Sequence, residues 1–76
     1  MKELLEHIAK NLVEYPDQVS VEEFERDGEV LLELRVAPSD MGKVIGRQGR
    51  IAKDIRTLIK SAAMRENKRV SVDIID

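Results

Sequence analysis

The 76-residue sequence has no cysteine, one histidine, two aromatic residues and no long apolar run. The absence of cysteine excludes disulfides and thiolate metal sites. His7 has no second histidine or acidic cluster at metal-ligand spacing, so we expect neither a metal nor a cofactor. No apolar run approaches the roughly 18 residues of a membrane span, and Glu3 and Glu6 make residues 1–15 unlike a signal peptide. We therefore expect a cytoplasmic protein without membrane association.

The usual components of a catalytic site are also missing. Catalysis needs a nucleophile with its base, an acid/base carboxylate pair or a metal, and no serine or threonine here has an evident partner. The glycines fit neither the G-x-x-x-x-G-K-[S/T] nor the G-x-G-x-x-G phosphate-binding pattern. We expect no enzymatic activity and no small-molecule substrate. With Tyr15 and Phe24 as the only aromatic residues, the stacking platform of an RRM or OB fold is absent too.

The net charge of −2 conceals a strong asymmetry along the chain. Residues 1–40 hold four Lys/Arg against eleven Asp/Glu, whereas residues 41–60 hold six Lys/Arg against Asp54 alone. A phosphate ligand responds to the potential within a Debye length, roughly 8–10 Å, more than to total charge. A basic helix face can simply be solvated. Here, however, the basic segment also contains a glycine loop, which favours anion binding.

The first half of the sequence predicts a helix and a β-hairpin. Apolar residues recur at helical spacing over residues 2–14, and Pro16 ends the helix. Residues 19–26 and 29–37 flank Asp27-Gly28, a strong signal for a two-residue hairpin turn.

The register of the hairpin follows if Arg26 faces Glu29. Val21 then pairs with Leu34, and one face of the hairpin becomes apolar. The first strand is predicted to be an edge, with or without a bulge, because the same register sets charged residues beside apolar ones: Glu23 beside Leu32 and Glu25 beside Val30.

The second half predicts two helices and a last strand. Ser39 or Asp40 can cap a short helix over about 40–45, a second helix covers 50–64, and apolar residues alternate over 70–74. Strands joined through helices should be parallel, with a right-handed connection. The order α-β-β-α-α-β therefore predicts an α+β fold, a three-stranded mixed sheet with three helices on one face.

The apolar stripe of the 50–64 helix leaves two interpretations open. It contains Ile51, Ile55, Leu58, Ile59 and Ala62. All of it can be core. If it is wider than one sheet can cover, the remainder is a surface for dimerisation or for another protein.

The loop Gly46-Arg47-Gln48-Gly49 joins the two helices inside the basic segment. Gly46 can end the first helix in a left-handed conformation, and the start of the second presents unpaired N–H groups and the positive end of its dipole. Such a site suits a phosphodiester. Two glycines three residues apart also occur in ordinary turns, so the motif depends on its context.

That context resembles the KH-domain signature. Residues 41–50, Met-Gly-Lys-Val-Ile-Gly-Arg-Gln-Gly-Arg, are similar to the segment with which KH domains clamp about four nucleotides. The preceding helix and strand resemble the type II, bacterial arrangement, and the short chain resembles the single-KH proteins of the KhpA (YlqC-like) family. The likeness covers residues 1–76 as one KH domain, with an N-terminal extension 1–27 and a β-α-α-β core 29–76 that contains the loop 46–49.

The resemblance implies binding of single-stranded RNA with low sequence specificity, in an RNA chaperone or a post-transcriptional regulator. It also implies a homodimer, or a heterodimer with a larger KH-containing protein. Carried over by position, the glycines would admit the RNA backbone, polar residues would contact phosphates, and apolar residues would line the groove. The expected RNA-binding residues are Lys43, Val44, Ile45, Gly46, Arg47, Gln48, Gly49, Arg50, Ile51 and, at the rim, Lys53; Ile45 and Ile51 can equally be core.

Overall fold

The computed structural model describes residues 1–76 and contains the helices and strands in the predicted order. The helices are α1 (Lys2–Leu12), α2 (Met41–Ile45) and α3 (Arg50–Arg65), and the strands are β1 (Ser20–Arg26), β2 (Glu29–Arg35) and β3 (Arg69–Ile75). Single 3₁₀ turns lie at Pro16–Gln18, Pro38–Asp40 and Arg47–Gly49. None of the helices has the length and apolar character needed to cross a membrane.

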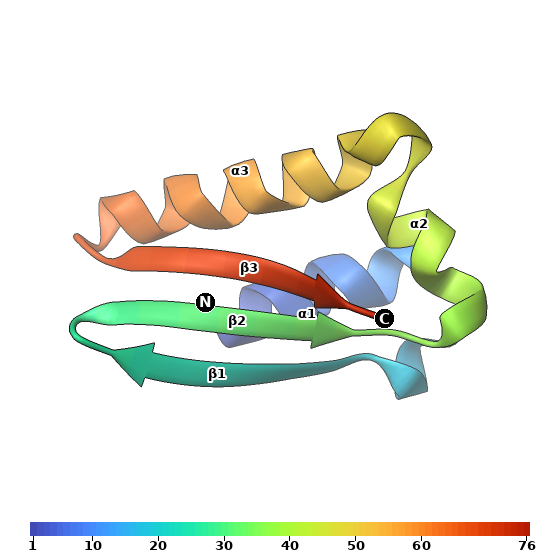
Figure 1. Cartoon of the computed structure of the whole chain (residues 1–76), viewed down its shortest axis with the longest axis horizontal. Helices are drawn as coiled ribbons and strands as arrows, with labels where there is room; N and C mark the ends of the chain where they lie inside the picture. Colours follow the sequence, from blue (N-terminus) through green and yellow to red (C-terminus); the bar gives the residue numbers. More distant parts are fainter.

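The three strands form one mixed sheet in the order β1-β2-β3 (Figure 1). Asp27-Gly28 joins β1 to antiparallel β2, and both turn residues have positive φ, as a type I′ hairpin requires. The predicted register is confirmed, since Arg26 opposes Glu29 and Val21 opposes Leu34. The pairing is continuous, so β1 is an edge strand without a bulge. β2 and β3 are parallel, as the helical connection predicts.

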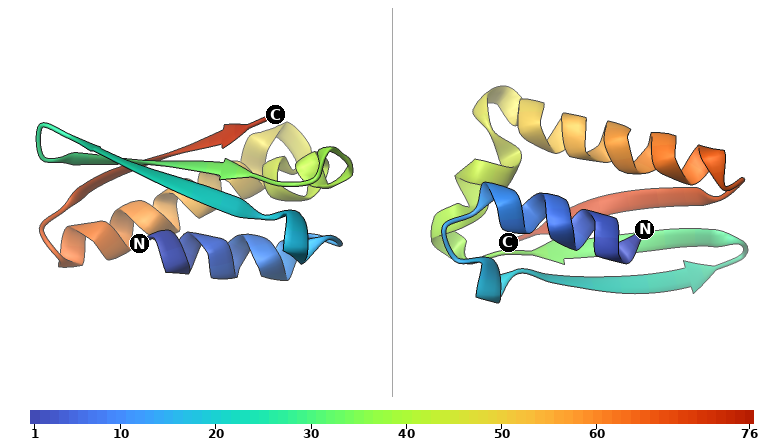
Figure 2. Two further views of the ribbon diagram at one scale, coloured as in Figure 1. Left: turned by 90° about the horizontal axis from the view of Figure 1, so that it is seen from below. Right: turned by 180° about the vertical axis from the view of Figure 1, so that it is seen from behind.

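The predicted α+β fold, with three helices and a three-stranded mixed sheet, is confirmed. α1 and α3 cover the same face, whereas α2 lies at the end of the sheet where β2 leaves it (Figure 2). The core is formed where apolar residues of the sheet meet those of the helices. Its members are Leu5, Ala9, Val21, Leu32, Leu34, Val44, Ile55, Ile59, Ala63, Val70 and Val72.

The opposite face of the sheet is uncovered and acidic at its centre. Glu22, Glu33 and Asp73 are aligned across the three strands. Like charges in such a row repel one another, and Arg35 offsets part of this repulsion by pairing with Glu22 at 3.1 Å and Glu33 at 3.7 Å. This face is unsuited to a polyanion.

Asp40 explains two differences from the sequence-based expectations, the end of α1 and the capping of α2. Its carboxylate accepts hydrogen bonds from the backbone N–H groups of Glu14 at 3.1 Å and Tyr15 at 3.0 Å, and the side chain is completely buried. The chain is therefore extended after Leu12, and α1 ends before the predicted position 14. Asp40 does occupy the N-cap position of α2, but its side chain makes no cap hydrogen bond there, contrary to the prediction.

Candidate nucleic-acid interface

The loop between α2 and α3 has a backbone that its two glycines permit. Gly46 has φ 75° and ψ 178°, a region that essentially only glycine populates. Gln48 (φ 58°, ψ 26°) and Gly49 (φ 74°, ψ 15°) adopt the left-handed helical conformation. The first helix thus ends at Gly46 with positive φ as predicted, but the left-handed turn itself lies two residues later.

Gly46 is also required by its neighbour. A Cβ at this position would lie 2.6 Å from Cγ1 of Ile51, well inside van der Waals contact, whereas a Cβ at Gly49 would meet nothing within 4 Å. Ile51 is partly buried and packs against the core. The side chain of Ile51 therefore closes over Gly46 and holds the loop against the body of the protein.

The tip of the loop is open to an anion. Arg47 and Gln48 are exposed, and no side chain caps the N-terminus of α3. The N–H groups of Gly49 and Arg50 are bonded to the carbonyls of Gly46 and Arg47, but the positive end of the α3 dipole is exposed beside the guanidinium of Arg47. This combination is favourable for an anion.

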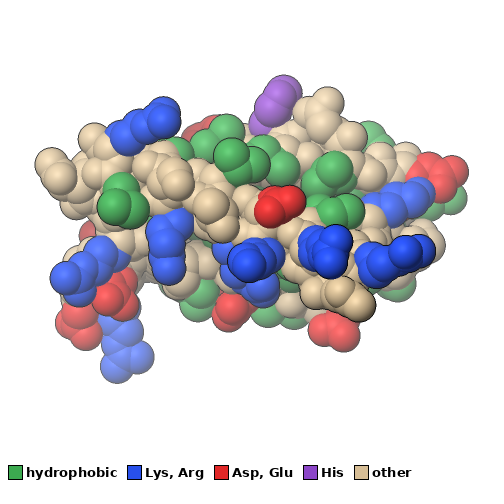
Figure 3. Space-filling view, turned by 90° about the horizontal axis from the view of Figure 1, so that it is seen from above, with side chains coloured by type: hydrophobic (Ala, Val, Ile, Leu, Met, Phe, Trp, Pro, Cys, Tyr) green, Lys and Arg blue, Asp and Glu red, His purple; other side chains and the backbone are tan.

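The cations of residues 47–60 differ from most others in the protein because they make no ion pair. Outside this segment, five of the eight basic side chains are paired with carboxylates and Lys2, Arg26 and Arg65 are not. The pairs are Lys10–Glu6, Arg35–Glu22, Lys43–Glu14, Lys68–Glu66 and Arg69–Glu29. The unpaired ones in this segment are Arg47, Arg50, Lys53, Arg56 and Lys60. A row of Lys and Arg side chains runs along one flank of α3 (Figure 3). These side chains can bind phosphates without first breaking an ion pair with a carboxylate.

This flank of α3 faces the edge of β3. The side chain of Arg56 crosses the gap, where its Nε donates a hydrogen bond to the Val72 carbonyl at 3.1 Å. A cavity of about 170 Å³ beside it is lined by Lys53, Arg56, Thr57 and Lys60. All four residues belong to α3; we call this hollow, together with the adjoining surface up to β3 that Arg56 spans, the α3–β3 groove.

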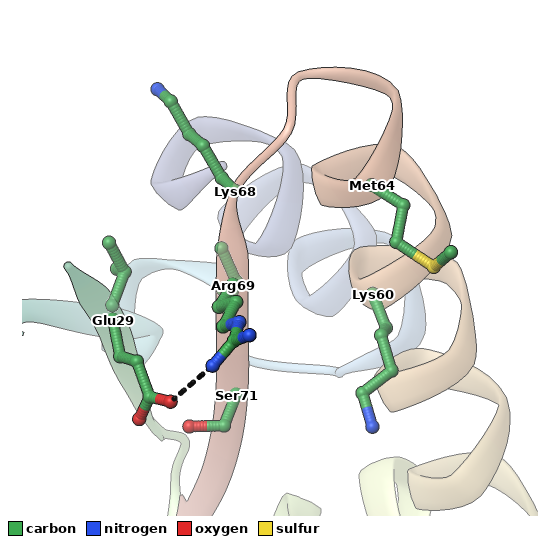
Figure 4. Close-up of a pocket in the computed structure, with 8 residues that line it drawn as sticks. Glu29, Lys60, Met64, Lys68, Arg69 and Ser71 are labelled. Carbon is green, nitrogen blue, oxygen red and sulfur yellow. Dashed lines mark ion pairs between the residues drawn. The ribbon is translucent and has the colours of Figure 1, made fainter.

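A larger cavity, of about 340 Å³, lies at the end of the α3–β3 groove far from the loop. Lys60 and Met64 extend from α3, while Lys68, Arg69 and Ser71 come from the other wall (Figure 4). Arg69 is paired with Glu29 at 3.7 Å. The cavity therefore combines cationic and apolar groups and extends the groove beyond the reach of the loop.

Lys43 is held differently from the other predicted phosphate ligands. Its Nζ lies 3.3 Å from Glu14 and 3.5 Å from the buried carboxylate of Asp40. The hydrogen bond to Glu14 is the main reason that the pKa of Lys43 is raised. Burial by itself would raise the pKa of Asp40, but the Glu14 and Tyr15 N–H groups and Lys43 outweigh it and lower that pKa. Lys43 thus fastens α2 to the segment after α1.

The structure brings most of the predicted site residues to one end of the molecule. Arg47, Gln48, Arg50 and Lys53 are exposed on the loop and the first turn of α3, and Ile45 is 37% exposed beside them. Val44 differs from the prediction. It is fully buried in the core and cannot line the groove, because α2 packs against α3 and α1.

Two basic residues of α3 outside the predicted site, Arg56 and Lys60, have the alternative interpretation of a solvated helix face. Both line the α3–β3 groove, and Arg56 is tied to β3. Their spacing from Lys53, three and seven residues along one helix, was the available signal for a common flank.

Comparisons with known proteins identify the family of the chain. The family model described as KhpA/KhpB, KH domain matches residues 2–74. The chain is 65% identical over 75 residues to the "RNA-binding protein KhpA" of Clostridium acetobutylicum, covering 99% of this chain and 100% of the relative. It is 46% identical over 76 residues to the protein of the same name from Chlamydia trachomatis, covering 100% of this chain and 97% of the relative.

A solved structure shares the fold. A variant of Aquifex aeolicus Era bound to GDP and AlF4⁻ matches with a TM-score of 0.66 at 19% identity. The match covers 96% of this chain and 28% of that one. At this identity the likeness concerns the fold alone.

Proposed function

The chain belongs to the KhpA/KhpB KH-domain family, and from that premise we propose that it binds single-stranded RNA through the Gly46–Gly49 loop. The sugar-phosphate backbone approaches the two glycines and the start of α3, while Arg47 and Arg50 neutralise phosphates. The bases lie toward the α3–β3 groove. The name of the relatives, RNA-binding protein, supports RNA as the ligand.

The observation that carries the proposal is the run of cations without ion pairs. Five basic side chains follow one another from the loop along α3, in a chain whose other basic residues are mostly paired with carboxylates. The uncovered sheet face has an acidic row at its centre, which disfavours a polyanion there. Phosphate contacts carry no sequence information, so binding is of low specificity and suits an RNA chaperone or a post-transcriptional regulator.

The test is the double variant Arg47→Asp/Gln48→Asp. It reverses the charge at the tip of the loop while leaving the two glycines and the core intact, so the far-UV circular dichroism stays unchanged and RNA binding is lost. Lys10→Asp/Asn11→Asp is the matched control, because it makes the same charge change on α1 at exposed positions. Loss of RNA binding in both variants, or in neither, would contradict the proposal.

The salt dependence provides a second measurement. With three or four phosphate contacts, the slope of log affinity against log salt should be on the order of −2 to −3 for a single strand. A slope near zero would exclude the loop cations as the source of affinity.

A protein-interaction module is the second candidate, and one observation favours it. Leu58 on α3 is 56% exposed, so the apolar stripe of this helix extends beyond what the sheet covers. Ile55 and Ile59 of the same stripe are buried. Association with a second copy or another KH protein through Leu58 is compatible with RNA binding and would add avidity on one strand. Sedimentation of the wild type and of Leu58→Lys tests it. If Leu58 mediates association, the sedimenting particle of the variant should have a lower mass than that of the wild type.

A further inference from the structure

Arg56 differs from its basic neighbours in how it is held. Its Nε is bound to the carbonyl of Val72, so the guanidinium is fixed across the α3–β3 groove. Because β3 is an edge strand, this carbonyl faces the groove and would otherwise be an unpaired acceptor. The two terminal amino groups of Arg56 have no partner in the protein. Lys53 and Lys60 lie on either side, on flexible stems with one ammonium each.

The position of Arg56 separates it from the phosphate contacts. It follows Gly49 by two helical turns, on the order of 10 Å along α3. If the RNA backbone is seated at the loop and follows the exposed cations of α3, the bases point toward β3. Arg56 reaches across to β3 and therefore meets bases, whereas Lys53 and Lys60 remain beside the backbone.

We propose, on the basis of the RNA-binding function above, that Arg56 gives the groove a base preference. A guanidinium held through Nε presents two parallel donors, which match a base edge with two adjacent acceptors. Guanine has such a pair in O6 and N7, and cytosine in O2 and N3. Adenine sets an amino donor beside N7 and opposes the guanidinium with one of its own donors. Without Arg56, the Val72 carbonyl would present an acceptor to the base. With Arg56 bound to that carbonyl, the groove presents two donors, which disfavours the amino group of adenine.

The experiment measures the affinity of single-stranded oligonucleotides of uridine that carry one guanosine, cytidine or adenosine at the centre. For the wild type we expect the guanosine or cytidine oligonucleotide to bind more tightly than the adenosine one. The ratio of the two affinities should be about 5- to 10-fold. This is the lower end of the range for a bidentate base contact, because the groove is open to water. Separate guanosine and cytidine arms identify which acceptor pair is used.

Arg56→Lys is the informative variant. It keeps the charge and a donor for Val72, so we expect unchanged stability and an unchanged salt slope, but the base preference should disappear because the ammonium is a single point donor. A purely structural bridge between α3 and β3 would move stability and leave the preference intact. Lys53→Met is the control; it should weaken all oligonucleotides alike, lower the salt slope by about 0.7 and retain the preference.

The outcomes separate this proposal from the function on which it rests. Equal wild-type affinity for the three oligonucleotides, or a preference that persists in Arg56→Lys, would overturn the role of Arg56 while RNA binding stands. Absence of wild-type binding to any of them would overturn both.

Discussion

Replacing Gly46 with alanine should be the most destabilising single change in the loop. The backbone there has φ 75° and ψ 178°, and a Cβ would lie 2.6 Å from Cγ1 of Ile51 and 2.9 Å from its Cβ. The obstruction is close to the root of a β-branched side chain, so rotation about χ1 cannot remove it. Either the loop or α3 must move.

The magnitude follows from two separate penalties. A non-glycine residue in this backbone region costs about 1–3 kcal/mol. Forcing a methyl group into packed surroundings costs about 1–3 kcal/mol more. The expected loss of about 2–6 kcal/mol is large for a domain of this length, whose whole stability is roughly 4–11 kcal/mol.

The other glycines of the segment are matched controls. Gly49→Ala meets only the left-handed backbone, with open space around the Cβ, and should cost about 1–2 kcal/mol. Gly42 lies within α2 with nothing near its Cβ, so Gly42→Ala should be neutral or stabilising by up to about 1 kcal/mol.

Urea denaturation monitored by circular dichroism measures all three variants, with the m-value as a check on two-state behaviour. Adding Ile51→Ala to Gly46→Ala should remove the contacts with Cγ1 and Cδ1, but neither the 2.9 Å contact with the Cβ of residue 51 nor the backbone penalty. This partial relief appears as a favourable coupling energy in a double-mutant cycle. A Gly46→Ala variant no less stable than Gly49→Ala, or a coupling energy near zero, would refute the close contact as the reason for glycine.

Three ion-paired positions give the remaining predictions. Because the pKa of Asp40 is lowered in the folded state, its carboxylate stabilises the protein above the unfolded-state pKa, and this stability is lost as pH falls through the folded-state pKa. In urea titrations at a series of pH values, the free energy of unfolding of Asp40→Asn should therefore fall less steeply with acid than that of the wild type. An equally steep fall would contradict this. Because Lys43 is already paired, Lys43→Gln should reduce the salt slope of RNA binding less than Arg47→Gln, which should reduce it by about 0.7; equal reductions in binding titrations would contradict this. Arg35→Gln leaves two facing glutamates unpaired and should destabilise the sheet by on the order of 0.5–1 kcal/mol in thermal unfolding, an effect that added salt should diminish.

Local signals in the sequence were sufficient for the strands and their register. Asp27-Gly28 specifies its turn through two residues that tolerate positive φ, and the turn then determines every pair along the hairpin. The alternation in β2 and β3 reports which residues face the helices. These features depend on neighbours in sequence, and the structure follows them closely.

The features that sequence reasoning missed depend on contacts between distant segments. Asp40 reads as a helix cap, yet its carboxylate is used 25 and 26 residues away, by the backbone of Tyr15 and Glu14. Val44 reads as a groove residue because it adjoins the loop, but the packing of α2 against α3 and α1 buries it. Arg56 reads as part of a wet helix face, and only the proximity of β3 gives it a partner.

The pairing of charges reconciles an acidic chain with a polyanionic ligand. Acidic residues of the body hold most of the basic residues outside the loop segment, so those cations contribute little potential beyond their own pair. The cations from Arg47 to Lys60 have no such partner, and a phosphate within a Debye length of them responds to their full charge. An unpaired cation gains a phosphate without giving up a carboxylate, whereas Lys43 must exchange one for the other. The affinity for RNA should therefore depend on which side chains are unpaired, and the net charge of −2 is a poor guide to it.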